Sequence, residues 1–147
     1  MKLYQVSVFV ENKEGRLAEV TKILAENNIN IKALSIADTT NFGILRMIVD
    51  NPKKANEIFM ENGFTISLTD VIAMEVADQP GGLAGAIKVL SENQISIEYM
   101  YAFIGYQKDK KDRAVIILRV DNIEKASEIL TKNNITLLTA NDIYNEN

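Results

Sequence analysis

The chain contains an internal repeat, and this repeat constrains the fold more than any other feature of the sequence. Sliding the sequence by 66 residues aligns Gly15–Ile31 with Gly81–Ile97, and nine of these seventeen positions are identical. Beyond Val49 the offset grows to 71 residues, so the second copy carries a five-residue insertion. A repeat of this size indicates that one structural unit occurs twice. We therefore expect two domains, residues 1–69 and 70–147.

Hydrophobic periodicity predicts the same order of elements in both copies. In the first copy, Val6–Val10 alternates with the period of a strand, and Leu17–Leu24 has apolar residues at helical spacing. A hairpin, a second helix and a last strand follow, and the last strand of the second copy is predicted at Ile135–Leu138. This order is typical of an α+β fold, the ferredoxin-like βαββαβ sandwich of four antiparallel strands with two helices on one face. The insertion falls near Gly105–Asp112, where a lysine-rich composition predicts an exposed hairpin loop.

Composition excludes several classes of function. The chain has no cysteine and no histidine, so it lacks disulfides, thiol nucleophiles and the usual zinc ligands. A net charge of -4 gives no basic field that would attract nucleic acid. No apolar run approaches the roughly 18 residues of a membrane span, and residues 1–10 alternate without a signal-peptide core. We expect a cytoplasmic protein that binds neither nucleic acid nor membranes.

The loop between the first strand and the first helix is the most informative site in each copy. It runs over Glu11–Leu17 and again over Ala77–Leu83. The first-turn amides of a helix carry partial positive charge, and glycine lets an anion approach the backbone closely. Asn12 and Asp78 each precede a loop glycine by three residues, and their side-chain oxygens could accept a hydrogen bond from an ammonium group. The pattern is suited to an α-amino acid, although Asn12 and Asp78 could equally cap their loops.

The same segments resemble the signature of the ACT domain family. The matching residues are Val10–Val20 with Asn28–Ile31, and Asp78–Leu83 with Ile95–Ile97. The resemblance covers essentially the whole chain, twice. Members of this family typically bind amino acids and regulate metabolic enzymes or transcription. The resemblance therefore implies an amino acid sensor with a metabolic enzyme as possible partner, with no cofactor and no catalytic activity of its own.

The resemblance also implies which residues bind the ligand. In serine-sensing members, an Asn before the helix and an Asn opening the second strand hold the effector across a domain interface. ACT domains often pair side by side, which implies one continuous antiparallel sheet from the two copies with the helices on one face. The residues expected at the ligand sites are Asn12, Glu14, Gly15, Arg16, Leu17, Asn30, Leu34, Asp78, Pro80, Gly81, Gly82, Leu83, Ser96 and Met100.

Three other functions were weighed. An RNA-binding module would need aromatic and basic residues on its sheet, where the chain has Ile44–Met47 and Val115–Leu118. A phosphatase-like enzyme would need an arginine cradle in the loop, but Arg16 is replaced by Gly82 in the second copy. A protein-interaction adaptor that has lost ligand binding remains open, because the loop glycines would persist for structural reasons.

The hairpin strands predict a second apolar surface, opposite to the helices. Soluble monomers rarely expose an apolar patch beyond several hundred Å². We therefore expect a homodimer in which these surfaces stack on each other. The residues predicted for this surface are Leu34, Ile36, Ile44, Ile48, Met100, Ile104, Val115 and Ile117.

Overall fold

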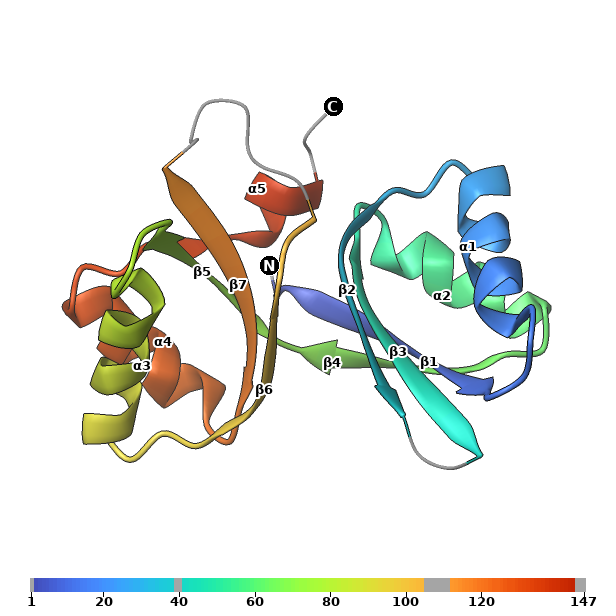
Figure 1. Ribbon diagram of the computed structural model, residues 1–147. Helices are drawn as coiled ribbons and strands as arrows, with labels where there is room; N and C mark the ends of the chain where they lie inside the picture. Colours follow the sequence, from blue (N-terminus) through green and yellow to red (C-terminus); the bar gives the residue numbers. More distant parts are fainter. Residues whose placement is uncertain (1, 39–40, 105–111, 145–147) are drawn as a thin grey trace. The chain divides into compact units, whose positions relative to one another are not determined.

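The computed structural model describes residues 2–38, 41–104 and 112–144, and the chain divides into two compact units (Figure 1). The division falls between Thr69 and Asp70. Most of the predicted insertion near Gly105–Asp112 lies outside the described residues.

Each unit also contains a short segment from the far end of the chain. Lys2 and Leu3 belong to the unit formed by the second copy, and Ile143 and Tyr144 belong to the unit formed by the first copy. The repeat therefore defines the body of each unit, whereas the terminal residues are exchanged between them.

The first unit has the predicted βαββαβ order. Strands β1 and β2 both pair antiparallel with β3, and the order across the sheet is β2-β3-β1-β4. Helices α1 and α2 lie on one face of this sheet (Figure 1). The elements are β1 (Tyr4–Glu11), α1 (Arg16–Glu26), β2 (Ile31–Asp38), β3 (Phe42–Val49), α2 (Pro52–Glu61) and β4 (Thr65–Asp70).

The second unit repeats this architecture, with the order β6-β7-β5-β8 across its sheet. The ferredoxin-like α+β fold is thus confirmed for both copies. The described strands form two four-stranded sheets, one in each unit. The side-by-side pairing of the copies into one continuous sheet stays a prediction. Its elements are β5 (Ile72–Ala77), α3 (Gly82–Glu92), β6 (Ile97–Ala102), β7 (Arg113–Val120), α4 (Ile123–Lys132) and β8 (Leu137–Leu138). The last helix, α5 (Ala140–Tyr144), begins in this unit and ends with the two residues that belong to the first unit.

Local capping explains where the helices begin and end. The side chains of Asn51 and Asn122 accept hydrogen bonds from helix amides at the starts of α2 and α4. A non-glycine residue adopts the left-handed conformation just after three of the four long helices. The φ angles are 57° at Asn28, 54° at Gln94 and 61° at Asn134. Asparagine, which occupies two of the three positions, tolerates this conformation better than most residues.

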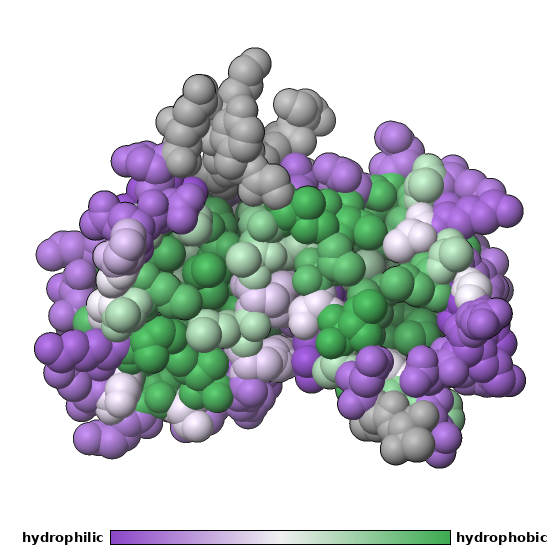
Figure 2. All heavy atoms as spheres, in the orientation of Figure 1, coloured by the Kyte–Doolittle hydropathy of each residue, from purple (hydrophilic) through white to green (hydrophobic). Residues whose placement is uncertain are grey.

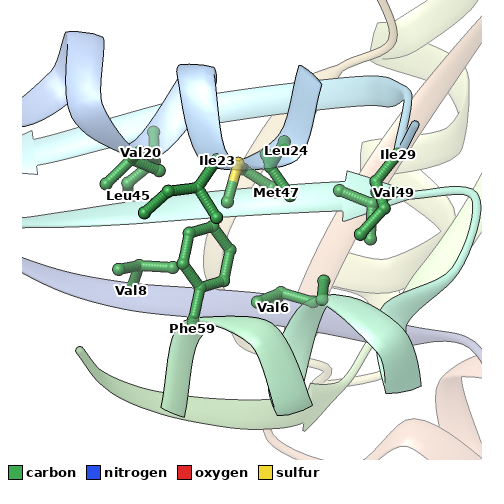
Figure 3. Close-up of a cluster of buried hydrophobic side chains, with 11 residues drawn as sticks. Val6, Val8, Val20, Ile23, Leu24, Ile29, Leu45, Met47, Val49 and Phe59 are labelled. Atoms are coloured by element: carbon green, nitrogen blue, oxygen red, sulfur yellow. The ribbon is translucent and has the colours of Figure 1, made fainter. Parts of the chain in front are cut away.

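The core of each unit lies between the sheet and its two helices. In the first unit, Phe59 reaches from α2 towards Val8 on β1 and towards α1 (Figure 3). Ten further buried residues surround it, and the second unit has a cluster of the same size. Figure 2 shows hydrophilic residues over the outer surfaces of the helices, whereas hydrophobic residues gather towards the strands. None of the helices that the structure describes is both long and apolar enough to span a bilayer.

Three residues predicted for the face opposite the helices lie on the helix side instead. Leu34 lies opposite the core residue Met47, and Met100 lies opposite the core residue Leu118. Ile36 follows Leu34 on the same face. The prediction was wrong because the register shifts near the start of β2 and of β6. A bulge of this kind inserts one residue and reverses the alternation of the side chains that follow it.

Four of the predicted residues do lie on the face opposite the helices. Ile48, Val115 and Ile117 are buried there, and Ile44 is half-buried. Ile104 is exposed but lies outside the regular strands. Four of the eight residues predicted for this face therefore lie on it, and the stacked homodimer stays a prediction.

The C-terminal segment differs most from the sequence prediction. Strand β8 covers only Leu137–Leu138, and the short helix α5, which was not predicted, follows it. Thr139 and Asp142 cap α5 reciprocally, with Asp142 Oδ2 2.6 Å from the backbone nitrogen of Thr139. This Thr-x-x-Asp pattern is a helix-start signal that the sequence already contains. At the end of α5, the Tyr144 hydroxyl accepts a hydrogen bond from the amide of Tyr4 at 2.9 Å, and burial raises the pKa of this hydroxyl.

We predict that Phe59→Ala lowers the free energy of unfolding by about 3–5 kcal/mol, because it empties a fully buried aromatic site. Urea denaturation followed by circular dichroism would measure this loss. The neighbouring Met60 is 63% exposed, so Met60→Ala should change stability by no more than about 0.5 kcal/mol. Equal effects of the two substitutions would contradict the packing described for α2.

Candidate functional site

The loop before α1 has a defined backbone that leaves the start of the helix accessible. The amide of Asn12 donates to the carbonyl of Asn41 at 3.1 Å, which ties the end of β1 to the start of β3. Gly15 then adopts φ 83° and ψ -11°, a left-handed conformation, directly before the helix. The carbonyl of Gly15 accepts the first helical hydrogen bond, from the amide of Glu19 at 2.9 Å. The turn thus requires glycine at this position.

The loop before α3 repeats this geometry. Gly81 has φ 88° and ψ -10°, and its carbonyl accepts from the amide of Gly85 at 3.0 Å. The amide of Asp78 donates to the carbonyl of Asp112 at 2.7 Å, which corresponds to the bond from Asn12 to Asn41 in the first copy. The two loops therefore share one backbone structure despite different side chains.

Each loop leaves amide groups unpaired at the first turn of its helix. Among the described residues, the amides of Leu17 and Ala18 have no acceptor, and neither do those of Leu83 and Ala84. Such groups carry the partial positive charge of the helix N-terminus. A carboxylate is the kind of group that they can bind.

The side chains of Asn12 and Asp78 belong to the same two loops. Both residues are exposed, and within the described part of the chain neither side chain makes a hydrogen bond. The N-cap positions are taken by Gly15 and Gly81, which have no side chain to cap with. The interpretation that Asn12 and Asp78 merely cap their loops therefore has no supporting contact.

Glu11, Lys13 and Glu19, which were not among the predicted site residues, form ion pairs at the first loop and at the start of α1. The Glu11 carboxylate lies 3.0 Å from Lys13 Nζ, and Arg16 bonds Glu19 at 3.0 Å. The hydrogen bond from Lys13, with its charge and that of Arg16, holds the pKa of Glu11 below its usual value. Arg16 is thus engaged with neighbouring carboxylates, as expected of a residue on the helix surface. Among the described residues, no group of acidic side chains is arranged to hold a metal ion.

The second loop lacks this network. The positions of Glu11, Lys13 and Arg16 are occupied in the second copy by uncharged residues, so Asp78 is the only charged residue of Ala77–Leu83. The two loops therefore present the same backbone amides in different electrostatic surroundings.

The strand-opening residues Asn30 and Ser96 also occupy matching positions. The amide of Asn30 donates to Asp50 Oδ1 at 3.1 Å, and the amide of Asp50 returns a bond to the Asn30 carbonyl at 3.1 Å. Ser96 makes the same pair of bonds with Asp121. The aspartates were not predicted to have a role, although the repeated Val-Asp-Asn motif contains them.

A single unit does not bring Asn12 and Asn30 together. Asn12 precedes α1 and Asn30 follows it, and a helix of 11 residues is about 16 Å long. The same separation applies to Asp78 and Ser96 around α3. Within one unit, each loop therefore brings together only the predicted site residues that belong to that loop, and not the residue that opens the second strand. The predicted residues of the two loops are Asn12, Glu14, Gly15, Arg16 and Leu17 in the first, and Asp78, Pro80, Gly81, Gly82 and Leu83 in the second.

The remaining two predicted site residues lie on the second strands. Leu34 is half-buried and packs against the core of the first unit. Met100 is 42% exposed on β6. Leu34 thus has a structural role already, whereas Met100 is accessible.

Known proteins resemble this chain in sequence and in fold. A family model described as an ACT domain pair matches residues 1–146. A crystal structure of a protein from Bacteroides thetaiotaomicron is 41% identical, covers 99% of this chain and 98% of that chain, and has a TM-score of 0.90. The ligand-free regulatory subunit of aspartate kinase from Thermus thermophilus is 16% identical, with a TM-score of 0.64 and coverage of 89% of this chain and 91% of that one.

A regulatory subunit of aspartate kinase from Thermus flavus is similar at the same level. It is 16% identical, covers 90% of this chain and 92% of that chain, and has a TM-score of 0.58. At this identity the two kinase subunits show a shared fold only. No curated protein matches the chain.

We predict that Gly82→Ala destabilises the second unit, because a Cβ at this position would overlap the backbone carbonyl oxygen of Ala77. The expected loss is about 1–3 kcal/mol of unfolding free energy, measured by urea denaturation. Gly85 lies in the same helix with open space around it, so Gly85→Ala should stabilise by about 0.4–1 kcal/mol. A stable Gly82→Ala protein would mean that helix and strand do not approach as closely as described.

Proposed function

Because the chain belongs to the ACT domain pair family, we propose that it is a regulatory protein that binds a free amino acid at the loops before α1 and α3. One observation carries the proposal. In both copies, the loop that leads to unpaired helix amides also carries an exposed Asn or Asp whose side chain makes no hydrogen bond among the described residues. An α-amino acid presents a carboxylate and an ammonium group on adjacent atoms, which suits this pairing.

In the proposed complex, the ligand carboxylate accepts from the amides of Leu17 and Ala18, and the ammonium donates to Asn12. Glu14 and Arg16 flank this position. In the second loop the ammonium meets the Asp78 carboxylate instead, beside Pro80, Gly81, Gly82 and Leu83. Charge-assisted hydrogen bonds are stronger than neutral ones. We therefore expect the two loops to bind the same ligand with different affinities.

The proposal also includes the residues of the second strands. A ligand on the loop of one domain can meet Asn30 and Leu34, or Ser96 and Met100, only where another copy of the domain presents its second strand. These residues would then contact the ligand side chain. The regulated partner in this proposal is a metabolic enzyme, since the chain itself offers no catalytic group in either loop.

A thermal-shift screen against the twenty amino acids tests ligand binding directly. A ligand that binds only the folded state stabilises it by about 2.7 kcal/mol at a hundredfold excess over Kd. For a protein of this size, the expected shift is several degrees. No shift with any amino acid would contradict the proposal and favour the protein-interaction adaptor.

We predict that Asn12→Ala weakens binding of the identified amino acid by roughly tenfold to a hundredfold, because one hydrogen bond to a charged group is lost. Isothermal titration calorimetry measures the change. Asn56 lies on α2, away from the loop, so Asn56→Ala is the matched control and should bind normally. Asp78→Ala should reduce binding at the second loop in the same way. Unchanged affinity in both Asn12→Ala and Asp78→Ala would remove the loops from the proposed site.

A further inference from the structure

The second unit contains a pocket of about 290 Å³ that has no part in the proposed amino acid site. It is lined by the start of β5, the first turns of α4, strand β8 and the residues Lys2 and Leu3. The loop before α3 follows the other end of β5, so the pocket and this loop are separated by the length of the strand. All of the lining residues belong to one unit.

The pocket exists because the last strand of the second copy is short. Strand β4 has six residues in the first copy, whereas its counterpart β8 has two. The reciprocal bonds between Thr139 and Asp142 start α5 and turn the chain away from the sheet. Leu3 takes part of the vacated place, since its carbonyl accepts from the amide of Val71 at 3.2 Å. The space that remains beside β5 therefore follows from a difference in length between the last strands of the two copies.

The lining combines an apolar floor with polar groups on one helix face. Leu3, Ile72 and Leu137 are among the apolar residues that form the floor. Glu124 and Ser127 also line the pocket, and their spacing of three residues places them on the same face of α4. In the described part of the chain, neither side chain has a hydrogen bond or an ion pair.

The other charges at the pocket are already paired. Lys2 Nζ lies 3.2 Å from Asp70 Oδ2, and the Asp70 carbonyl accepts from Arg119 at 2.7 Å. Since Lys2 and Asp70 neutralise each other, Glu124 supplies the uncompensated charge, which is negative. A ligand that completes this site must therefore bring a positive charge together with an apolar body.

We propose that this pocket binds a small aliphatic primary amine. Its ammonium group donates to the Glu124 carboxylate and the Ser127 hydroxyl, and its alkyl chain lies against the apolar floor. Ligand pockets measure about 300–1,000 Å³ and are mostly apolar with a few polar groups, so this one suits a ligand of a few carbon atoms. A carboxylate in the ligand would be repelled by Glu124. The site therefore selects amines over the free amino acids proposed for the loops.

Nuclear magnetic resonance of the full-length ¹⁵N-labelled protein tests this proposal with n-butylammonium as the probe. Neutral n-butanol and anionic butyrate, which have similar alkyl chains, serve as comparison ligands. We expect saturable shifts of the amides of Val71, Ala73 and Ser127 with n-butylammonium, at least tenfold weaker binding of n-butanol, and no binding of butyrate. Absence of saturable shifts with n-butylammonium, or equal binding of n-butanol, would overturn the proposal.

Two variants locate the binding. Glu124→Gln should weaken n-butylammonium roughly tenfold by removing the charged partner of the ammonium. Glu128→Gln is the matched control, since Glu128 lies on α4 but pairs with Lys132 at 3.0 Å and does not line the pocket. Equal affinity of Glu124→Gln and the unsubstituted protein would overturn the assignment of Glu124.

Ser127→Phe fills the pocket and should abolish the shifts, with circular dichroism as the check on folding. If this variant does not fold, the smaller Ser127→Val, which removes the hydroxyl, should still weaken binding several-fold. Retained binding in a folded Ser127→Phe protein would place the amine elsewhere. The test is independent of the amino acid site, because Asn12→Ala should leave n-butylammonium binding unchanged.

Discussion

The structure depends on the burial of two helices against one face of a four-stranded sheet. The first core, centred on Phe59, joins α1 and α2 to β1 and β3 through side chains that are almost fully removed from water. Burial of this kind is the dominant favourable term in folding. It requires the chain to leave β1 and reverse onto the sheet within four residues, and only a left-handed residue such as Gly15 makes that turn without strain. The exposed amides at the start of α1 are therefore a consequence of core packing.

Differences between the two copies explain how one architecture can hold different chemistry. Arg16 is tied to carboxylates around the first loop, whereas Gly82 at the matching position leaves no room for a side chain beside Ala77. The glycine before each helix has the same left-handed conformation, so the two loops differ in charge and in how closely the helix start approaches the preceding strand. The last strands differ in length, and the short β8 opens a pocket that the first copy has no equivalent reason to form. Each change is local, because the equivalent cores of the two units tolerate variation at the ends of their helices and strands.

Helices and strands with a regular hydrophobic pattern over many residues were predicted correctly from the sequence. Features that depend on one inserted residue or on one capping pair were missed. Alternation identified β1 and helical spacing identified α1, because many residues contribute to each pattern. In β2, one inserted residue reversed the face of Leu34 and Ile36, and period-two reasoning cannot detect such a bulge. Helix α5 was missed for a different reason. Its signal, Thr139 followed by Asp142, is present but lies in a segment with no counterpart in the repeat.

The sequence by itself determined that one structural unit occurs twice, the ferredoxin-like fold of each copy and the location of the two glycine loops. These features rest on repetition and periodicity, which are properties of the chain order alone. Only the tertiary structure decided that Asn12 makes no capping bond, that Asp50 holds the amide of Asn30, and that Glu124 lines a pocket. Such facts depend on which side chains meet after the chain has folded. Hydrogen bonds and pockets are set by distances of a few ångströms between residues far apart in sequence, and no periodic pattern encodes those distances.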